Sequence, residues 1–344
     1  MMYVGDFNHK PCSISSTSNN HSIISTGISG SGKSCRNNKI EVACVRDNKT
    51  VLVLDIHQAH KSEALFPPIA AEYENYVNRI PVLRDGLDLS LLSPIRNSNG
   101  MQEPFVHHVN SALNALVANQ NMGSKQMAAL RSALIYAIQN KNKFPSETVA
   151  LATALLSCRD SSFQAVYQKL WTLLNSNVLR PSPSKIKRGC INILDFSGID
   201  NSTQATLCEV ILSTLWRNVQ FGSFSSIYGE CLIVLDEFQN ISLKNGSTLR
   251  VLLHEGRRWG INLLLSTQTL EIFPNEVVAA LNQSATRLYF RPSQYDYRKT
   301  VKEILQYTGC DLSKELASLK IGECFGVGNF QCDRFELNRP ILLK

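Results

Sequence analysis

A glycine-rich segment near the N-terminus has the residue spacing of a phosphate-binding loop. Gly27 is followed, after four residues, by Gly32, Lys33 and Ser34, and a short β-branched run precedes it. Glycines let backbone N–H groups approach a polyphosphate, and a helix that begins there directs its positive end at the anion. We expect Lys33 to reach the β- and γ-phosphates of ATP, and the Ser34 hydroxyl to bind Mg²⁺. The full expected nucleotide-binding set is Gly27, Ile28, Ser29, Gly30, Ser31, Gly32, Lys33, Ser34 and Cys35.

Two adjacent acids end an aliphatic run in the second half of the chain. Asp236 and Glu237 follow directly after residues 232–235, which are all aliphatic. Packing of a buried strand does not require two acids at its tip, so we expect Asp236 to associate with the metal and Glu237 to orient or activate the attacking water. Asp195, at the end of another aliphatic run, is the rival for the metal-associated acid. A second acid favours hydrolysis over phosphate transfer to a small molecule.

A glutamine and several arginines are further candidates for the same reaction. Gln268 ends an aliphatic segment and could touch the γ-phosphate or the attacking water. Arg257 could stabilise charge on the transferring phosphoryl group of a neighbouring subunit, or could only cap the carbonyls at a helix end. Arg287 and Arg291 compete for the role between subunits.

Composition excludes several classes of protein. The 344 residues are 44% hydrophobic and 18% charged, which is enough apolar material for a buried core and excludes global disorder. The formal net charge of +7 is a mild bias towards anionic partners. The chain has neither a secretory signal pattern nor an apolar run of about 18 residues, which predicts a cytoplasmic protein without membrane insertion. None of the ten cysteines has C-x-x-C spacing, so we expect buried thiols rather than zinc ligands or disulfides.

The elements that must position these residues follow an alternating pattern. Expected strands lie at 22–25, 50–54, 190–198, 231–239, 261–268 and 287–292, with helices at 203–220, 243–258 and 275–283. This alternation predicts an α/β fold with a mainly parallel sheet. Residues 61–187 instead show apolar residues at helical spacing, including a stripe of Met127, Leu130, Leu134 and Ile138 that we expect to be a packing face. A hairpin or a pair of edge strands is expected around Gly328.

Together the motifs resemble the HerA–FtsK superfamily of DNA-pumping ATPases, and most closely its HerA branch. The phosphate loop and the acidic strand end are two parts of the match. The segment 55–58 is similar to the family's D-P-H-G-like motif, and 255–260 is similar to its E-G-R-K-[FY]-G motif. Residues 319–323 match the closing L-x-x-G-E motif. The resemblance covers about residues 4 to 340.

This resemblance implies a RecA-like P-loop NTPase core over 1–60 and 188–344, with a helical insertion over 61–187. It implies an ATPase of the DNA translocase or helicase type, assembled as a homo-hexamer around double-stranded DNA and acting with a nuclease or other effector protein. Lys33, Ser34, Asp236, Glu237 and Gln268 then take the roles given above, and Arg257 is the first arginine of the family motif. HerA proteins usually carry a β-barrel before this core, and no such segment is evident here.

Two alternatives remain open from the sequence. Conjugation or type IV secretion ATPases and viral genome-packaging ATPases share this core, so the chain could be the motor of a mobile element. A non-motor ATPase that scaffolds an antiviral defence complex is the other alternative.

Overall fold

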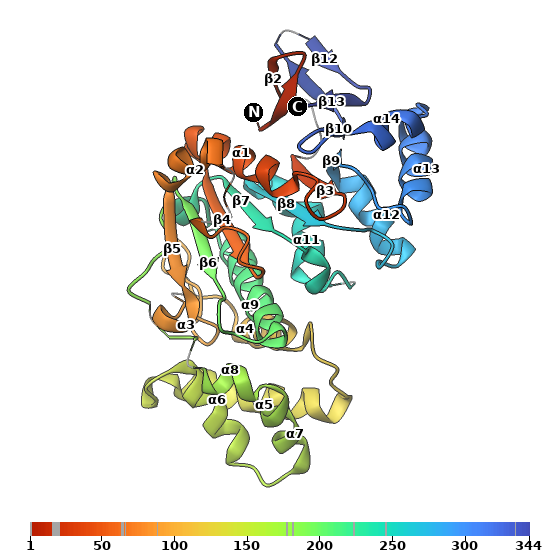
Figure 1. The fold of residues 1–344 in the computed structure, drawn as a ribbon. Coiled ribbons are helices and arrows are strands. Elements are labelled where there is room, and N and C mark those ends of the chain that lie inside the picture. Colours follow the sequence, from red (N-terminus) through yellow and green to blue (C-terminus); the bar gives the residue numbers. More distant parts are fainter. Residues whose placement is uncertain are drawn as a thin grey trace.

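A nine-stranded sheet forms the centre of the computed structural model, which describes every residue except 1, 16–20, 63, 64, 66, 88, 177, 181, 223, 245 and 334. The strand order is β13-β10-β9-β3-β8-β7-β4-β6-β5 (Figure 1). Its strands are β3 (Ser22–Thr26), β4 (Thr50–Asp55), β5 (Val77–Pro81), β6 (Ile191–Asp195), β7 (Cys231–Leu235), β8 (Ile261–Thr267), β9 (Ala285–Tyr289), β10 (Cys324–Val327) and β13 (Ile341–Leu343). All neighbouring pairs from β9 to β5 are parallel, and only β10 and β13 are antiparallel to their neighbours. The predicted α/β class with a mainly parallel sheet is confirmed.

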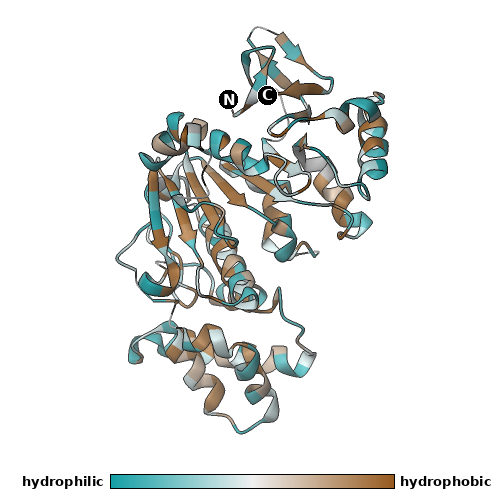
Figure 2. Ribbon diagram, in the orientation of Figure 1, coloured by the Kyte–Doolittle hydropathy of each residue, from teal (hydrophilic) through white to brown (hydrophobic). Residues whose placement is uncertain are grey.

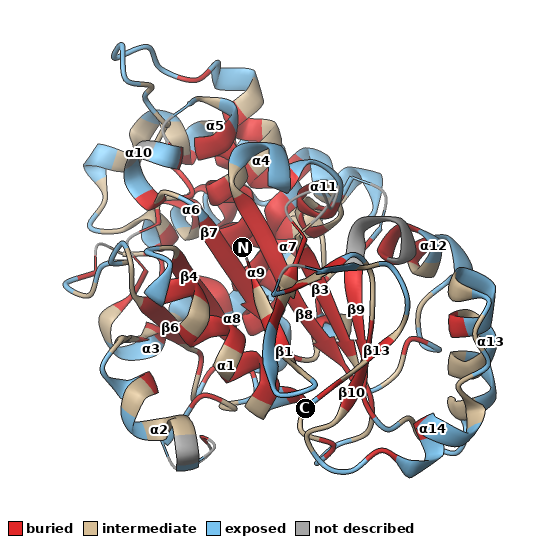
Figure 3. Cartoon of the chain, turned by 90° about the horizontal axis from the view of Figure 1, so that it is seen from above, coloured by how far each residue is buried: buried red, intermediate tan, exposed pale blue. Residues whose placement is uncertain are grey.

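Helices cover both faces of this sheet, as the continuous apolar strands require. Leu52 and Leu54 of β4 belong to one core cluster together with α9 (Asn201–Gln220), and Val51 and Val53 belong to a second cluster that includes residues of α1 (Lys33–Arg46). Successive side chains of a strand point to opposite faces, so one apolar strand supplies both clusters. Figures 2 and 3 show the central strands as hydrophobic and buried.

Twelve further α-helices are described in the core and the helical part. Those of the helical part are α4 (Phe105–Val117), α5 (Ser124–Asn140), α6 (Glu147–Leu156), α7 (Ser161–Lys169) and α8 (Trp171–Asn175), and α5 to α8 lie below the sheet in Figure 1. Leu130 and Leu134 are fully buried, so this part of the expected stripe is a packing face. The others are α2 (Pro67–Glu74), α3 (Val82–Asp85), α10 (Phe224–Tyr228), α11 (Thr248–Glu255), α12 (Asn275–Ser284), α13 (Tyr297–Thr308) and α14 (Ser313–Ser318). None of the helices described has both the length and the apolar character that a membrane span requires.

A strand and a second sheet were not expected from the sequence. β5 lies within the range expected to be helical, yet it pairs with β6 as the edge of the main sheet. The second sheet has the order β1-β2-β11-β12 and joins the two ends of the chain, with β1 (Tyr3–Phe7), β2 (Lys10–Ile14), β11 (Phe330–Cys332) and β12 (Phe335–Leu337). The two strands around Gly328 were expected to pair with each other, and this expectation was wrong. β10 and β11 flank this glycine but belong to different sheets.

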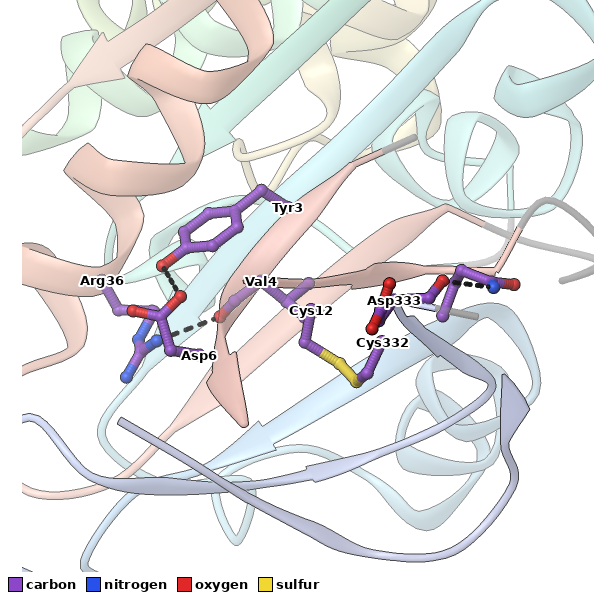
Figure 4. Close-up of a disulfide and its surroundings, with 8 residues drawn as sticks. Tyr3, Val4, Asp6, Cys12, Arg36, Cys332 and Asp333 are labelled. Atoms are coloured by element: carbon purple, nitrogen blue, oxygen red, sulfur yellow. Dashed lines mark hydrogen bonds between the residues drawn. A yellow bond between two sulfur atoms is a disulfide. The ribbon is translucent and has the colours of Figure 1, made fainter. Parts of the chain in front are cut away.

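The expectation that all cysteines are thiols is also wrong. Cys12 of β2 and Cys332 of β11 are register partners, and a disulfide joins them (Figure 4). Positions 320 residues apart cannot be recognised as neighbours without the strand pairing that brings them together. The other eight cysteines are free, and four of these are buried: Cys44, Cys208, Cys231 and Cys324.

Candidate functional site

The phosphate loop connects the end of β3 to the start of α1. Gly27 and Gly32 both have positive φ, 151° and 103°. A Cβ on Gly32 would lie 2.6 Å from the backbone of Gly322, and a Cβ on Gly27 would lie 2.7 Å from Phe290 Cβ. Both positions therefore require glycine for conformation and for space. Gly322 also donates its N–H to the Ser31 carbonyl at 2.9 Å, so the closing segment of the chain braces this loop.

Lys33 begins α1 and folds back over the loop. Its Nζ donates to the carbonyl oxygens of Gly27, at 2.6 Å, and Ile28, at 3.0 Å. Burial lowers the pKa of this ammonium, while the nearby charges of Glu237 and Asp236 act in the opposite direction. Ser34, the next residue, is exposed. A buried cation among backbone groups, beside an open helix start, is an arrangement suited to phosphate oxygens.

Asp236 follows β7 and is held by a residue of α1 that sequence analysis missed. Asn37 Nδ2 donates to Asp236 Oδ1 at 3.1 Å and to Ser266 Oγ at 2.7 Å, and thus connects three elements. Asn37 lies four residues after Lys33, which places both on one face of the helix. That spacing was the available signal, although asparagine within a helix is common enough that it does not stand out.

The second oxygen of Asp236 fits the expected role at a metal. Oδ2 is buried and has no hydrogen-bond partner among the described residues. Burial, as the largest cause, raises the pKa of this carboxyl group, and the charge of His60 opposes the shift. A buried carboxylate oxygen without a donor is a suitable partner for Mg²⁺ or for its water shell.

Glu237 and Gln268 are in direct contact. Gln268, just beyond β8, donates from Nε2 to Glu237 Oε1 at 2.8 Å. Gln239 Nε2 donates to Glu237 Oε2 at 2.7 Å and is a second residue that sequence analysis missed. β7 and β8 are parallel neighbours, so their carboxyl ends meet at one edge of the sheet. The structure thus brings together the acid and the glutamine that the sequence assigned to the attacking water.

The rival acid Asp195 lies elsewhere along the same edge. β4 separates β6, which carries Asp195, from β7. Asp195 Oδ1 instead accepts hydrogen bonds from Ser197, from its N–H at 2.9 Å and its hydroxyl at 2.5 Å. Its contacts are therefore those of a turn-forming aspartate, and Asp236 is the candidate for the metal-associated role.

Asp55, in the segment similar to the D-P-H-G-like motif, lies in a buried polar cluster beside Asp236. His60 lies between two carboxylates, with Nε2 3.1 Å from Glu41 Oε1 and Nδ1 3.4 Å from Asp55 Oδ1. Tyr73 donates its hydroxyl to Glu41. Complete burial acts to lower the pKa of His60, but the charge of Glu41 and the hydrogen bonds to Asp55 and Glu41 together raise it well above its usual range. The cluster ties α1 to β4 and α2.

The candidate arginines lie apart from this group. Arg257 is exposed in the 3₁₀ turn η4 (Gly256–Trp259), which precedes β8, whereas Gln268 follows the same strand. Seven strand residues span roughly 20 Å, so Arg257 is at the opposite edge of the sheet. Its charge instead lowers the pKa of His21, together with burial of that histidine as the larger cause; His21 lies just before β3.

The competing arginines have other contacts. Arg287 is buried, with an ion pair to Glu303 at 3.1 Å and the Tyr307 ring 4.2 Å from its guanidinium carbon. The Arg287 side chain therefore has its partners within its own chain. Arg291 contributes its backbone carbonyl, which accepts the N–H of Ile28 in the phosphate loop at 3.0 Å.

Comparison with known proteins places this fold. No family model matches the sequence, and no curated protein matches it. VirB4 of Thermoanaerobacter pseudethanolicus is 13% identical with a TM-score of 0.70, over 100% of this chain and 96% of that one. The bacterial conjugative coupling protein TrwBdeltaN70, in an unbound form, is 12% identical with a TM-score of 0.63, over 100% and 89%. The plasmid coupling protein TrwB with the ATP analogue ADPNP is 12% identical with a TM-score of 0.61. This match covers 94% of this chain and 85% of that one. At these identities the likeness shows the fold alone, a mixed α/β fold with a mostly parallel central sheet that this chain shares with these structures.

Proposed function

We propose that the chain is an ATP-hydrolysing ring motor that moves double-stranded DNA. One observation carries this proposal. Lys33, Asp236 and Glu237 lie at the carboxyl edge of the sheet, while Arg257 lies at the opposite edge. In the proposed ring, Arg257 acts on the triphosphate of a neighbouring copy of the chain, because it lies at the far edge of the sheet from the phosphate loop of its own copy.

The chemistry assigned to each side chain follows from its contacts. Lys33 leaves the carbonyls of Gly27 and Ile28 to bind the β- and γ-phosphates of ATP. Glu237 orients the attacking water and accepts its proton, and Gln268 reports the presence of the γ-phosphate through its contact with Glu237. Ser34 and Asp236 would hold Mg²⁺, which neutralises charge on the phosphate oxygens when it is bound.

A closed ring of six subunits is the assembly that we propose from the HerA–FtsK resemblance. In such a ring the Arg257 edge of one subunit meets the phosphate loop of the next. Double-stranded DNA is the proposed substrate of movement, and the net charge of +7 is compatible with binding to its phosphates. A nuclease or other effector protein is the proposed partner of a HerA-like motor.

A conjugation or type IV secretion motor is the second candidate function. The solved structures similar over the full chain are named as VirB4 and as a conjugative coupling protein, which favours this candidate over genome packaging or a defence scaffold. Both candidates predict the same ATPase and the same DNA dependence, and they differ in the partner protein.

The test is the ATPase rate with and without duplex DNA, together with the particle mass. We expect hydrolysis that duplex DNA stimulates, in a particle of about six times the 38.4 kDa chain mass. Affinity for DNA is expected to fall steeply with salt and to differ little between unrelated duplexes, since a sliding motor contacts phosphates rather than base edges. Hydrolysis that no duplex stimulates would favour the non-motor scaffold.

A further inference from the structure

Two carboxamides hold the two oxygens of Glu237. Gln268 donates to Oε1 at 2.8 Å, and Gln239 donates to Oε2 at 2.7 Å. The donors come from different elements, the end of β8 and the turn η3 (Phe238–Asn240). Each oxygen therefore has a fixed donor, and the plane of the carboxylate is set by both together.

The backbone beside Glu237 is fixed as well. Glu237 has φ of 52°, in the left-handed region that non-glycine residues seldom occupy. The next residue, Phe238, is fully buried and stacks on Phe273 with ring centroids 5.1 Å apart and an angle of 10° between the rings. With the backbone fixed, the Glu237 carboxylate can move only by rotation about its side-chain bonds. The hydrogen bond from Gln239 restricts these rotations.

The contacts of Gln239 indicate that its amide serves to hold Glu237. Its carbonyl oxygen Oε1 is buried and has no hydrogen-bond partner in the described part of the chain. If this side chain served only for packing, its amide would leave a buried acceptor unsatisfied. An apolar side chain of the same length would fill the space without an unsatisfied acceptor. The amide can donate an N–H hydrogen bond to Glu237, and an apolar side chain cannot.

We propose that Gln239 is a positioning residue for hydrolysis, one that keeps the Glu237 carboxylate in the orientation that serves the attacking water. This inference rests on the proposed ATPase function. In the reaction, the water oxygen bonds to the γ-phosphorus as the bond from phosphorus to the oxygen of the departing ADP breaks, and Glu237 takes the proton of the water. Gln239 touches neither ATP nor water and acts only through Glu237.

Gln239→Met tests this because methionine has the same length and no N–H. We expect kcat for ATP to fall by about 10-fold to 100-fold with KM and the melting temperature unchanged, since misplacement of a reacting group by about 1 Å costs on the order of 10² in rate. Gln239→Asn, which keeps the amide but shortens its reach, should show the same loss and provides a second variant if the first does not fold. The matched control is Gln120→Met, because Gln120 lines the same groove of about 450 Å³ as Gln239 and hydrogen-bonds Ser202 and Thr206 rather than a site residue.

A double-mutant cycle separates positioning from a general structural effect. In a Glu237→Gln background, Gln239→Met should leave the residual rate unchanged, because the group that it positions is already absent. An unchanged kcat in the single variant, or an additive loss in the double variant, would overturn the inference while leaving the ATPase proposal intact. Absence of ATP turnover by the unmodified protein would overturn the proposed function and this inference with it.

Discussion

The two edges of the central sheet are built differently. At the carboxyl edge Lys33, Asn37, Asp236, Glu237 and Gln268 are each held by hydrogen bonds to other described residues. At the amino edge Arg257 is exposed, and its side chain has no hydrogen bond or ion pair to another described side chain. The side chains at the first edge are thus held in place in the absence of any nucleotide. At the second edge the charge of Arg257 has no partner among the described side chains, as the proposed action on a neighbouring subunit requires.

Loss of Arg257 should have the largest effect on turnover. Arginines that reach a neighbour's phosphate contribute about 10³–10⁵ in rate in other P-loop enzymes. We expect Arg257→Ala to bind ATP normally and to hydrolyse it slower by that order, as measured by nucleotide binding and steady-state turnover. The control is Arg258→Ala at the adjacent exposed position, where Arg258 lies 5.9 Å from the Trp259 ring. Equal losses in both variants would indicate a general effect on η4 instead.

Binding and hydrolysis should separate at the carboxyl edge. Glu237→Gln keeps the side-chain length and removes the base, so we expect retained ATP binding and a loss of about 10²–10⁴ in kcat. Lys33→Ala should weaken ATP binding as well, because the phosphates lose their cation. Near-normal turnover of Glu237→Gln would mean that another group activates the water, and Asp195 would be the next residue to test.

Asn37→Ala should give a smaller loss of ATPase activity, and its size should depend on the Mg²⁺ concentration. Without the donor at 3.1 Å, Asp236 is less well oriented, so we expect a higher Mg²⁺ requirement and a fall of about 10-fold to 100-fold in activity, as is typical of residues that orient metal ligands. A Mg²⁺ titration of turnover measures this. Asn114→Ala, at an exposed position of α4, is the control. Saturating Mg²⁺ that restores no activity would contradict the assigned role.

The smallest expected effect is on stability and involves Glu209 of α9. Burial raises the pKa of Glu209 from 4.5 to about 7, and its Oε1 has no partner among the described residues. Between these pH values the unfolded chain releases the proton while the folded chain keeps it, so the folded state loses stability as pH rises. Glu209→Gln removes the titrating carboxyl group, so the free energy of unfolding of this variant should exceed that of the unmodified protein by more at high pH. We expect this difference to be about 2 kcal/mol larger at pH 8 than at pH 5. Denaturant unfolding at the two pH values measures this, and an equal difference at both would contradict it.

The sequence was most informative where one strand or turn decides the position of a side chain. The phosphate loop, the acids after β7 and Gln268 after β8 could all be placed, because each lies at the tip of an aliphatic run and parallel strands end at a common edge.

Features that depend on distant pairing could not be placed. β5 has the sequence VNRIP, too short and too polar to indicate a strand within a helical region. The terminal sheet pairs β2 with β11, and nothing local to either strand indicates the other. Asn37 and Gln239 have ordinary residue types for a helix and a turn, so their roles become visible only when the atoms that they contact are known.

The measurement that tests the central claim most directly mixes two inactive variants. Arg257→Ala retains an intact carboxyl edge, and Glu237→Gln retains an intact Arg257 edge. If the two edges of neighbouring subunits form one site, mixed particles contain some interfaces with both intact groups, and we predict that ATP turnover returns. Particle mass confirms co-assembly in the same samples. Turnover that does not recover in verified mixed particles would contradict a site shared between subunits.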